Sequence, residues 1–372
     1  MRRLAVAAAA LLVATSPAIA GLPRVHAKAY IVESGTTGDV LAAFNPDRPV
    51  PMASITKLMT VLVTLEHARP NEVVTVAAGA AGVGESTVHL RAGERVTVRD
   101  LLEAALIQSA NDAADALAYY VGHGNEAAFV AMMNGRARQL GLRHTHYARP
   151  DGLDAPGHYS TARDVTFLAR YLMRNPIVRD IVRRRTATIA GGRTLYTWND
   201  LLSSFPGVFG VKTGHTMNAG WSEVAAVRRD GKLVYATLLG GPDRSTRNAD
   251  LTALLRWGLA RYVHVETVAA GRTFARAQTG YGRGDLRLVA LRPLVSLARV
   301  DRPLVERVVA PVVVSLPVER GAHLGEVRIF QDGRLIGRRA LVAERTVHRP
   351  GLFGRIAWYS GRTVHHAIGW VS

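Results

Sequence analysis

A serine and a lysine lie three residues apart just before an apolar run. Ser54 and Lys57 belong to the segment MASITKLMT, and the apolar run continues from Leu58 to Leu65. On a helix the two side chains would share one face within contact range. A serine hydroxyl is a poor nucleophile until a base removes its proton, and burial beside apolar residues lowers the pKa of a lysine toward that task. The pair therefore predicts an activated serine, with backbone N–H groups at the helix start favouring an oxyanion.

Two further motifs carry polar side chains that suit the same chemistry. In the S-A-N motif at 109–111, the serine could carry a proton and the asparagine could hold a substrate carbonyl, although both residue types also cap helices. In the K-T-G motif at 212–214, the lysine and threonine could hold a carboxylate, although both also suit an exposed edge strand. The glycine would let a ligand approach the strand closely. Together the three motifs lie on a helix start, an interhelical loop and a strand.

The segments around these motifs predict an α+β domain. A strand–turn–strand pattern occupies 28–45, helical patterns fill the middle, and a strand meander with an Asp230-Gly231 turn begins near Val208. Thr161 and Asp164 form a helix-capping arrangement. The hairpin and the meander should build one sheet from both ends of the segment. Helical patterns are predicted at 98–108, 112–122, 126–141, 159–175 and 248–263.

The pattern of residue types changes after about residue 263. Short β-rich runs separated by Gly, Pro and Asp-Gly turns predict a small all-β module, a sandwich. The 372 residues also suggest more than one domain, because single cores stop growing at roughly 250–300 residues. The predicted division is 1–20 as signal peptide, 21–262 as catalytic domain, 263–349 as β-rich domain and 350–372 as tail.

The first twenty residues have the layout of a cleavable secretory signal. Two arginines precede an apolar stretch from Leu4 to Val13, and Ala18-Ile19-Ala20 stands before Gly21. The chain has no cysteine, which excludes disulfides and thiol chemistry. Its formal charge is +18, but export argues against nucleic acid as the partner. Anionic lipid headgroups or cell-wall polymers are the expected counterions, and a solvated surface without specific meaning is the alternative.

The tail has the pattern of an amphipathic helix. Such a segment should lie in the interface of an anionic bilayer through residues 351–372 rather than cross it. The alternative is a helix packed on the β-rich module. The apolar side consists of Leu352, Ile356, Tyr359, Thr363, Ala367 and Trp370, widened by Phe353, Ala357, Val364 and Ile368, and the polar side consists of Arg355, Arg362, His365 and His366.

The 13 histidines invite a search for metal ligands. His144 with His146, and His365 with His366, lack the spaced partners that zinc sites use. The sequence therefore predicts no metal and no cofactor.

Several longer segments resemble one family. The order S-x-x-K, S-A-N, K-T-G is close to the signature of penicillin-binding proteins and class A β-lactamases. MASITKLMT, LIQSANDAADALA, RPDGLDAPGHYSTARD and GVKTGHTMNAGWSEVA resemble the low-molecular-mass penicillin-binding proteins that are D-alanyl-D-alanine carboxypeptidases. VETVAAGRTFA and FQDGRLIGRRALV resemble their β-rich second domain, and the tail resembles their membrane anchor. The resemblance implies a β-lactamase/DD-peptidase-like catalytic domain.

The resemblance also implies an activity and a role for each motif residue. The enzyme would remove the terminal D-alanine from peptidoglycan stem pentapeptides through an acyl-enzyme, and β-lactams would acylate and inhibit it. The implied roles are Ser54 as nucleophile, Lys57 as its base, Ser109 as proton carrier to the leaving D-alanine, Asn111 as holder of the substrate amide, Lys212, Thr213 and Gly214 as the edge that holds the terminal carboxylate, and the backbone N–H groups of Ser54 and His215 as the oxyanion hole.

The sequence departs from the family pattern in one place. The family often has an arginine between two asparagines before the K-T-G strand, whereas this chain has Trp198 beside Asn199, so no arginine contact is expected there. A second arginine that the family uses would be Arg244 or Arg247. No glutamate occurs from Ala127 to Ser222, the interval in which class A β-lactamases have the one that drives deacylation. Slow release of bound penicillin is therefore expected.

Two alternatives to carboxypeptidase activity stay open at this stage. One is DD-endopeptidase activity on cross-bridges, and the other is a catalytically silent scaffold that binds the cell wall. In each case the expected location is the outer face of the cytoplasmic membrane, with the tail as a peripheral anchor.

Overall fold

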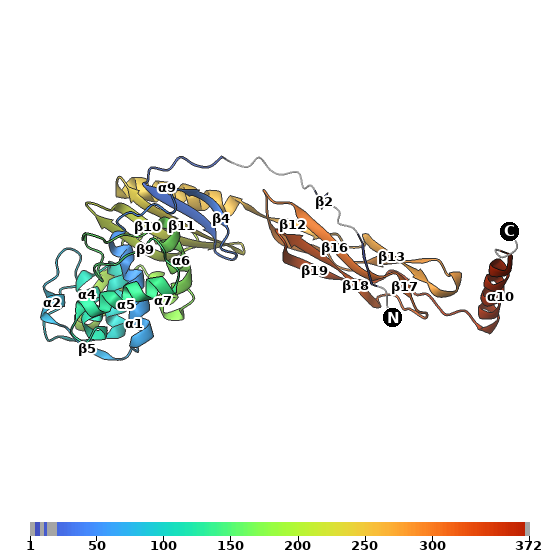
Figure 1. Cartoon of the computed structure of the whole chain (residues 1–372), viewed down its shortest axis with the longest axis horizontal. Coiled ribbons are helices and arrows are strands. Elements are labelled where there is room, and N and C mark those ends of the chain that lie inside the picture. Colours follow the sequence, from blue (N-terminus) through green and yellow to red (C-terminus); the bar gives the residue numbers. More distant parts are fainter. Residues whose placement is uncertain (1–3, 8–10, 13–20, 369–372) are drawn as a thin grey trace. The chain divides into compact units, whose positions relative to one another are not determined.

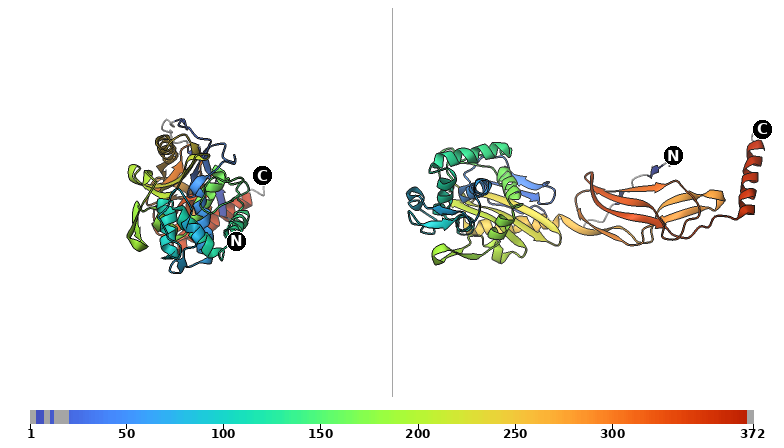
Figure 2. Two further views of the ribbon diagram at one scale, coloured as in Figure 1. Left: turned by 90° about the vertical axis from the view of Figure 1, so that its left-hand side faces the viewer. Right: turned by 90° about the horizontal axis from the view of Figure 1, so that it is seen from below.

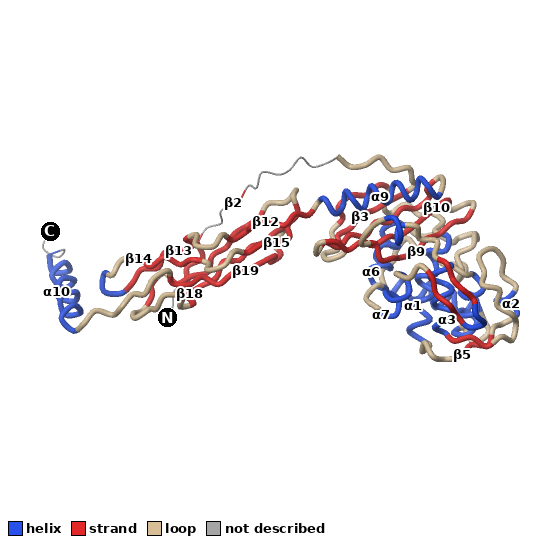
Figure 3. The backbone as a smooth tube through the Cα atoms, turned by 180° about the vertical axis from the view of Figure 1, so that it is seen from behind, coloured by secondary structure: helices blue, strands red, loops and turns tan. Residues whose placement is uncertain are grey.

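The computed structural model describes residues 4–7, 11–12 and 21–368, with side chains for 21–360. Their contacts divide the chain into two units. One unit is Ala20–Ala260, and the other joins Arg261–Ser372 to Met1–Ile19. Helices and strands are mixed in the first unit, whereas strands dominate the second, as the colours of Figure 3 show.

A five-stranded antiparallel sheet is the centre of the first unit, with the order β4-β3-β11-β10-β9. Its hairpin comes from the start of the unit and its meander from the end, so the predicted α+β class is confirmed. Asp230 and Gly231 have φ angles of 50° and 75°, which gives the tight turn between β10 and β11 the primed geometry that a two-residue hairpin favours. The strands are β3 (Ala29–Ser34), β4 (Val40–Phe44), β9 (Val208–Thr216), β10 (Gly220–Arg229) and β11 (Lys232–Gly241).

Helices cover both faces of this sheet (Figures 1 and 2). On one face α9 (Arg244–Ala260) packs on β3, β10 and β11, and on the other α6 (Ala162–Leu172) packs on β3 and β11. Thr161 caps α6 as predicted, since its hydroxyl accepts a hydrogen bond from Asp164 N at 3.1 Å. Beyond α6 lies a cluster of α1 (Lys57–His67), α4 (Asn111–Val121) and α5 (Glu126–Gln139).

The segment predicted as one helix at 98–108 changes its geometry halfway. An α-helix, α3 (Val98–Glu103), continues as a π-helix, Ala104–Gln108, and ends at Ser109 with a left-handed φ of 66°. The remaining elements of this unit are a 3₁₀ turn at Ala53–Thr56, β5 (Val73–Thr75), α2 (Ala78–Ala81), β6 (Arg95–Thr97), α7 (Pro176–Val182), β7 (Thr186–Ile189), a 3₁₀ turn at Ala190–Gly192, β8 (Arg193–Tyr196) and α8 (Leu201–Ser204).

The second unit is β-rich, as the sequence predicts. Its larger sheet has the order β1-β16-β18-β19-β14-β13-β17, and β12 pairs separately with β15. Its core contains Leu286, Leu288, Val327, Ile329 and Leu341. The strands are β12 (Tyr262–Val268), β13 (Thr273–Thr279), β14 (Asp285–Val289), β15 (Leu294–Arg299), β16 (Leu304–Pro311), β17 (Val313–Val314), β18 (His323–Gln331) and β19 (Arg334–Ala343), with a 3₁₀ turn at Gly280–Gly282.

The two ends of the chain both belong to the second unit. At the N-terminus, β1 (Leu4–Ala7) and β2 (Leu11–Leu12) pair with β16, and the rest of the predicted signal segment lies outside the described residues. At the C-terminus, α10 (Leu352–Ile368) forms a helix whose Trp358 ring lies 5.5 Å from that of Tyr281. Trp370 of the predicted apolar side lies outside the described residues. Among the described helices, none is both long and apolar enough to cross a membrane.

Candidate active site

The three motifs meet at one cavity of about 180 Å³ in the first unit, formed where β9 meets the helical cluster. Strand β9 runs beside the 3₁₀ turn that contains the candidate nucleophile. The motif residues that line the cavity are Ser54, Ser109, Asn111, Thr213, Gly214 and His215.

The amine of Lys57 is buried beside the hydroxyl of Ser54. Its Nζ lies 2.9 Å from Ser54 Oγ, 2.7 Å from Asn111 Oδ1 and 2.6 Å from the carbonyl oxygen of Asp151. Burial lowers the pKa of Lys57 to about 8, although the Asp151 carboxylate opposes the shift. A neutral amine has two N–H donors and one lone pair. The asparagine and the carbonyl take the two donors, so the lone pair is left for the hydroxyl proton of Ser54.

The turn that presents Ser54 is fixed by its neighbours. Ala53 has a left-handed φ of 51°, an uncommon conformation for a residue with a side chain. The Thr56 hydroxyl donates to the carbonyl of Ala53 at 2.7 Å and also contacts His158 Nε2 at 2.7 Å. Gly152 has a φ of 89°, and a Cβ there would lie 2.2 Å from the Ala53 carbonyl oxygen. The loop around Gly152 therefore packs directly on the nucleophile turn.

Ser109 joins the second motif to the third. The ammonium of Lys212 donates to Ser109 Oγ at 2.8 Å and to the carbonyl of Thr213 at 2.9 Å. Burial, helped by the charge of Lys57, lowers the pKa of Lys212 well below its usual value. Lys212 thus lies behind Ser109, while Thr213 lines the cavity itself. Lys212 therefore contacts the cavity through Ser109.

Gly214 allows β9 to approach the nucleophile turn. A Cβ at this position would lie 2.9 Å from the carbonyl oxygen of Met52 and 3.1 Å from the backbone nitrogen of Ser54. The close approach brings the next residue, His215, beside the same turn. The imidazole of His215 lies against the ring of Trp221, its direct partner on β10, with ring centroids 4.2 Å apart and the planes tilted by 31°.

The structure separates the two candidate arginines. Arg247 is 1% exposed and lines the cavity. Arg244 instead forms two hydrogen bonds to the Asp200 carboxylate, at 2.8 and 2.6 Å, and lies over the ring of Trp198 at 5.2 Å. Trp198 also lines the cavity, and its indole N–H donates to the carbonyl of Gln108 at 3.0 Å. The indole ring of Trp198 therefore lines the cavity where the family often has an arginine.

Sequence reasoning missed the loop that closes the cavity beside Asn111. Glu85 and Ser86 line the cavity, and Glu85 has a left-handed φ of 61°. The loop is tied to the second motif, because Asn111 Nδ2 donates to the carbonyl of Gly84 at 2.9 Å and Asn111 N to that of Ser86 at 2.7 Å. Leu153 completes this side. No sequence motif marks these residues, since only the fold brings them to the cavity.

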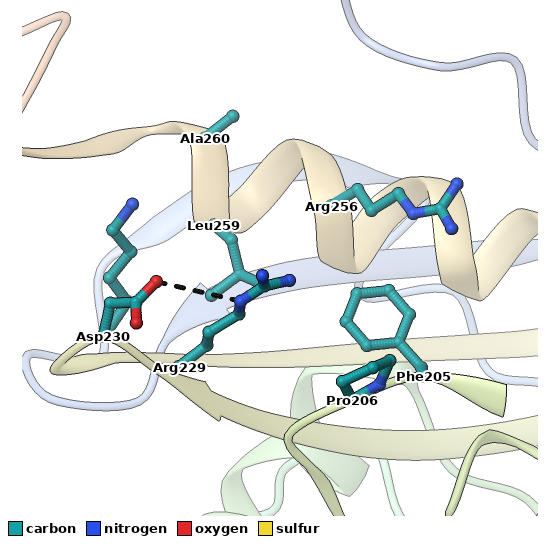
Figure 4. A pocket seen from close by; sticks show the side chains of 8 residues that line it. Phe205, Pro206, Arg229, Asp230, Arg256, Leu259 and Ala260 are labelled. Carbon is teal, nitrogen blue, oxygen red and sulfur yellow. Dashed lines mark ion pairs between the residues drawn. The ribbon is translucent and has the colours of Figure 1, made fainter. Parts of the chain in front are cut away.

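A second, larger pocket of the same unit contains none of the motif residues (Figure 4). Its volume is about 270 Å³, and it lies between the β10–β11 turn and the end of α9. Its lining includes Phe205, Arg256 and an ion pair of 3.7 Å between Arg229 and Asp230. Chemistry rather than volume therefore identifies the candidate site. Among the residues that the structure describes, no group of three or more His, Cys, Asp or Glu side chains could hold a metal ion.

The family model and the sequence relatives agree on one activity. The family model described as D-alanyl-D-alanine carboxypeptidase matches residues 15–243. D-alanyl-D-alanine carboxypeptidase DacD of Salmonella typhimurium is 31% identical over an alignment of 388 positions that covers 96% of this chain and 98% of that protein. D-alanyl-D-alanine carboxypeptidase DacA of Escherichia coli is 31% identical over 94% of this chain and 91% of that protein.

The solved structures that match are a penicillin binding protein and a DD-transpeptidase. Penicillin binding protein 5 from Haemophilus influenzae matches 89% of this chain and 100% of its own with a TM-score of 0.64 and 27% identity. The Streptomyces K15 DD-transpeptidase matches 65% of this chain and 100% of its own with a TM-score of 0.62 and 32% identity. The first covers both units, whereas the coverage of the second equals about one unit of this chain.

Proposed function

The chain belongs to the D-alanyl-D-alanine carboxypeptidase family of serine peptidases, and we propose that Ser54 is the residue through which it removes the terminal D-alanine of peptidoglycan stem peptides. The observation that carries this assignment is the contact of 2.9 Å between Ser54 Oγ and the buried amine of Lys57. The pKa of that lysine, about 8, lets a useful fraction of the amine be neutral near neutral pH.

Acylation begins when Ser54 Oγ attacks the carbonyl carbon of the penultimate D-alanine. Lys57 takes the hydroxyl proton through its lone pair, and the new C–O bond forms as the carbonyl oxygen becomes an oxyanion. The backbone N–H groups of Ser54 and His215 would stabilise that charge, a contribution for which one donor is worth about 10²–10³ in rate. Thr213 and Arg247 would hold the terminal carboxylate of the substrate, since both line the cavity.

The C–N bond then breaks and the leaving D-alanine takes a proton. Ser109 is placed to pass on the proton that Lys57 took from Ser54, because its hydroxyl lines the cavity and lies 2.8 Å from the amine of Lys212. Water completes the reaction by attacking the ester on Ser54, which releases the shortened peptide. A β-lactam would acylate Ser54 in the same way, and the absence of a glutamate from Ala127 to Ser222 supports slow hydrolysis of that ester.

Two measurements test this assignment. Wild-type protein should be labelled by a fluorescent penicillin and should release D-alanine from diacetyl-L-lysyl-D-alanyl-D-alanine. Ser54→Ala should remove the label and reduce D-alanine release by at least about 10³-fold while the protein stays folded. A label that persists on Ser54→Ala would place the nucleophile elsewhere, and absence of label on the wild type would favour the scaffold alternative.

We further propose that the enzyme works outside the cytoplasmic membrane and rests on its surface through α10. The signal-like layout of residues 1–20 supports export. On α10 the side chains of Leu352, Phe353, Ile356 and Tyr359 are between 56% and 88% exposed, and apolar residues gathered on one helix favour insertion at a bilayer interface. The net charge of +18 would favour anionic lipids.

A further inference from the structure

A carboxylate is buried next to the arginine of the active-site cavity. Glu223 is completely buried on β10, directly opposite Thr213 on β9. Its Oε2 lies 3.2 Å from Nε of Arg247. Neither oxygen of Glu223 has a hydrogen-bond partner of good geometry among the described residues. A buried carboxylate without such partners is costly, so its presence beside a functional arginine calls for a physical reason.

Glu223 is the main anion available to Arg247. The guanidinium also donates to the neutral Asn248 Oδ1, from Nε at 3.1 Å and from Nη2 at 2.6 Å. Asp200 lies farther away, at 3.5 Å from Nη2, and already accepts hydrogen bonds from Arg244 at 2.8 and 2.6 Å. All these contacts use Nε and Nη2. Within the described residues Nη1 makes no hydrogen bond, which leaves one edge of the guanidinium for a ligand in the cavity.

The charges around Glu223 have opposing effects on its pKa. Burial raises its pKa to about 7, although the positive charges of Arg247, Lys212 and Arg244 oppose the shift and the negative charge of Asp200 adds to it. A ligand carboxylate at Arg247 would place a second anion beside the same guanidinium. Because like charges raise the pKa of a carboxyl group, ligand binding and protonation of Glu223 should favour each other.

We propose that Glu223 is a positioning residue that directs Arg247 toward the cavity and takes up a proton when the terminal carboxylate of the substrate binds. The inference rests on the proposed function, because it assigns that carboxylate to the cavity. At pH values well below its pKa of about 7, Glu223 is mostly neutral and binding is tightest. Above pH 7 binding must either protonate Glu223 or tolerate two adjacent anions, so the affinity for carboxylate-bearing ligands falls as the pH rises.

Binding to the Ser54→Ala protein tests the pH response without turnover. The probes are diacetyl-L-lysyl-D-alanyl-D-alanine and its C-terminal amide, followed by the fluorescence of the tryptophans that line the cavity, Trp198 and Trp221. Between pH 6 and 8.5 the Kd of the acid should rise about tenfold, while the Kd of the amide stays flat. Calorimetry in two buffers of different ionisation enthalpy should show proton uptake for the acid alone.

Two substitutions added to Ser54→Ala then separate the charge from the contact. Glu223→Gln keeps an acceptor for Arg247 but cannot ionise, so the Kd of the acid should stay near its low-pH value at every pH. Glu223→Leu has a similar size but no acceptor, so the acid should bind about tenfold more weakly at every pH and the amide unchanged. A pH response that persists in Glu223→Gln would assign it to another group, such as Lys57 or Lys212, and overturn the proposal.

The remaining outcomes are also decisive. If the Glu223→Leu and parent proteins bind the acid equally well, Glu223 does not position Arg247. If the leucine variant does not fold, the glutamine variant still decides the question, because amide and carboxyl have nearly the same shape. Labelling of the Ser54-containing protein by fluorescent penicillin reports the proposed function separately. If the Ser54→Ala parent shows no pH response while the Ser54-containing protein is labelled, the role of Glu223 alone is refuted.

Discussion

The protonation state of Lys57 controls whether Ser54 can react. Nζ lies 2.9 Å from Ser54 Oγ, and burial lowers the pKa of the amine to about 8. Below this pH the ammonium form has no lone pair for the hydroxyl proton, so the rate of acylation by a penicillin should fall about tenfold per pH unit. Stopped-flow measurements between pH 6 and 9 should give a rate that rises with pH and levels off above about 8.

Arginine at the same position supplies the control, because a guanidinium keeps its proton throughout this range. Lys57→Arg should not be acylated at any of these pH values, and circular dichroism should show that it remains folded. A wild-type rate that is constant from pH 6 to 9 would show that the base is not Lys57.

The candidate site could be predicted from the sequence only where its chemistry is local. Ser54 and Lys57 share a motif whose spacing implies contact on a helix, and the structure brings them to 2.9 Å. The choice between Arg244 and Arg247 depends on which side of α9 faces the sheet, and a single sequence does not determine that phase. Glu85 and Glu223 belong to no motif, because each reaches its place through a loop or a strand register set by the whole unit.

The approach of β9 to the nucleophile turn depends on the missing side chain at position 214. A Cβ there would lie 2.9 Å from the Met52 carbonyl oxygen and 3.1 Å from Ser54 N, and both neighbours are backbone atoms that cannot rotate away. Gly214→Ala should therefore push β9 from the turn, lowering the free energy of unfolding by about 1–3 kcal/mol. Displacement of the reacting groups by about 1 Å should slow penicillin acylation about 10²-fold.

Gly84→Ala is the matched control for this strand, since it also lies by the cavity but a Cβ there would meet no atom within 4 Å. Its carbonyl, which accepts from Asn111 Nδ2, is unchanged by the substitution. The control should keep the wild-type melting temperature and acylation rate. Equal effects of the two substitutions would mean that the close approach at Gly214 has no special part in the site.

In the helix before the second motif, the sequence pattern predicts that a helix forms but not its type. Apolar periodicity predicts a helix at 98–108, and helical structure does occupy this segment. The change to a π-helix at Ala104 leaves the residue types and their polarity unaltered, so periodicity does not reveal it. Its consequence is local and functional, because it delivers Ser109 in a left-handed conformation within reach of Lys212 at 2.8 Å.

The catalytic unit should function without the β-rich unit. All cavity residues lie within 20–260, which has its own sheet and core. The Streptomyces K15 DD-transpeptidase matches only 65% of this chain with 100% of its own, so a comparable unit exists as a complete solved chain. A protein made of residues 21–260 should be acylated by penicillin within about twofold of the full-length rate. Loss of acylation in this fragment would show that the second unit supports the site.

The composition of the sequence changes near the point where the packing core changes. The switch from mixed helical and strand patterns to short β runs was expected near residue 263, and contacts divide the chain between Ala260 and Arg261. The order of strands in the larger sheet of the second unit could not be predicted. Its strands are short and similar, and long-range pairing such as that of β14 with β19 leaves no local signal.

Membrane attachment is a property that α10 should give to the whole molecule. Truncation after Pro350 should leave D-alanine release intact and abolish flotation with vesicles of phosphatidylcholine and phosphatidylglycerol.

Replacing both Phe353 and Ile356 by serine tests the apolar side of α10 directly. The substitution removes two side chains that are 88% and 56% exposed, which should make the free energy of insertion about 3 kcal/mol less favourable and reduce partitioning about 100-fold. The control Thr346→Ser, which lies outside α10, should change neither D-alanine release nor flotation with the vesicles. A truncated protein that still floats would place the membrane contact elsewhere, and the basic surface of the two units would then be the feature to mutate.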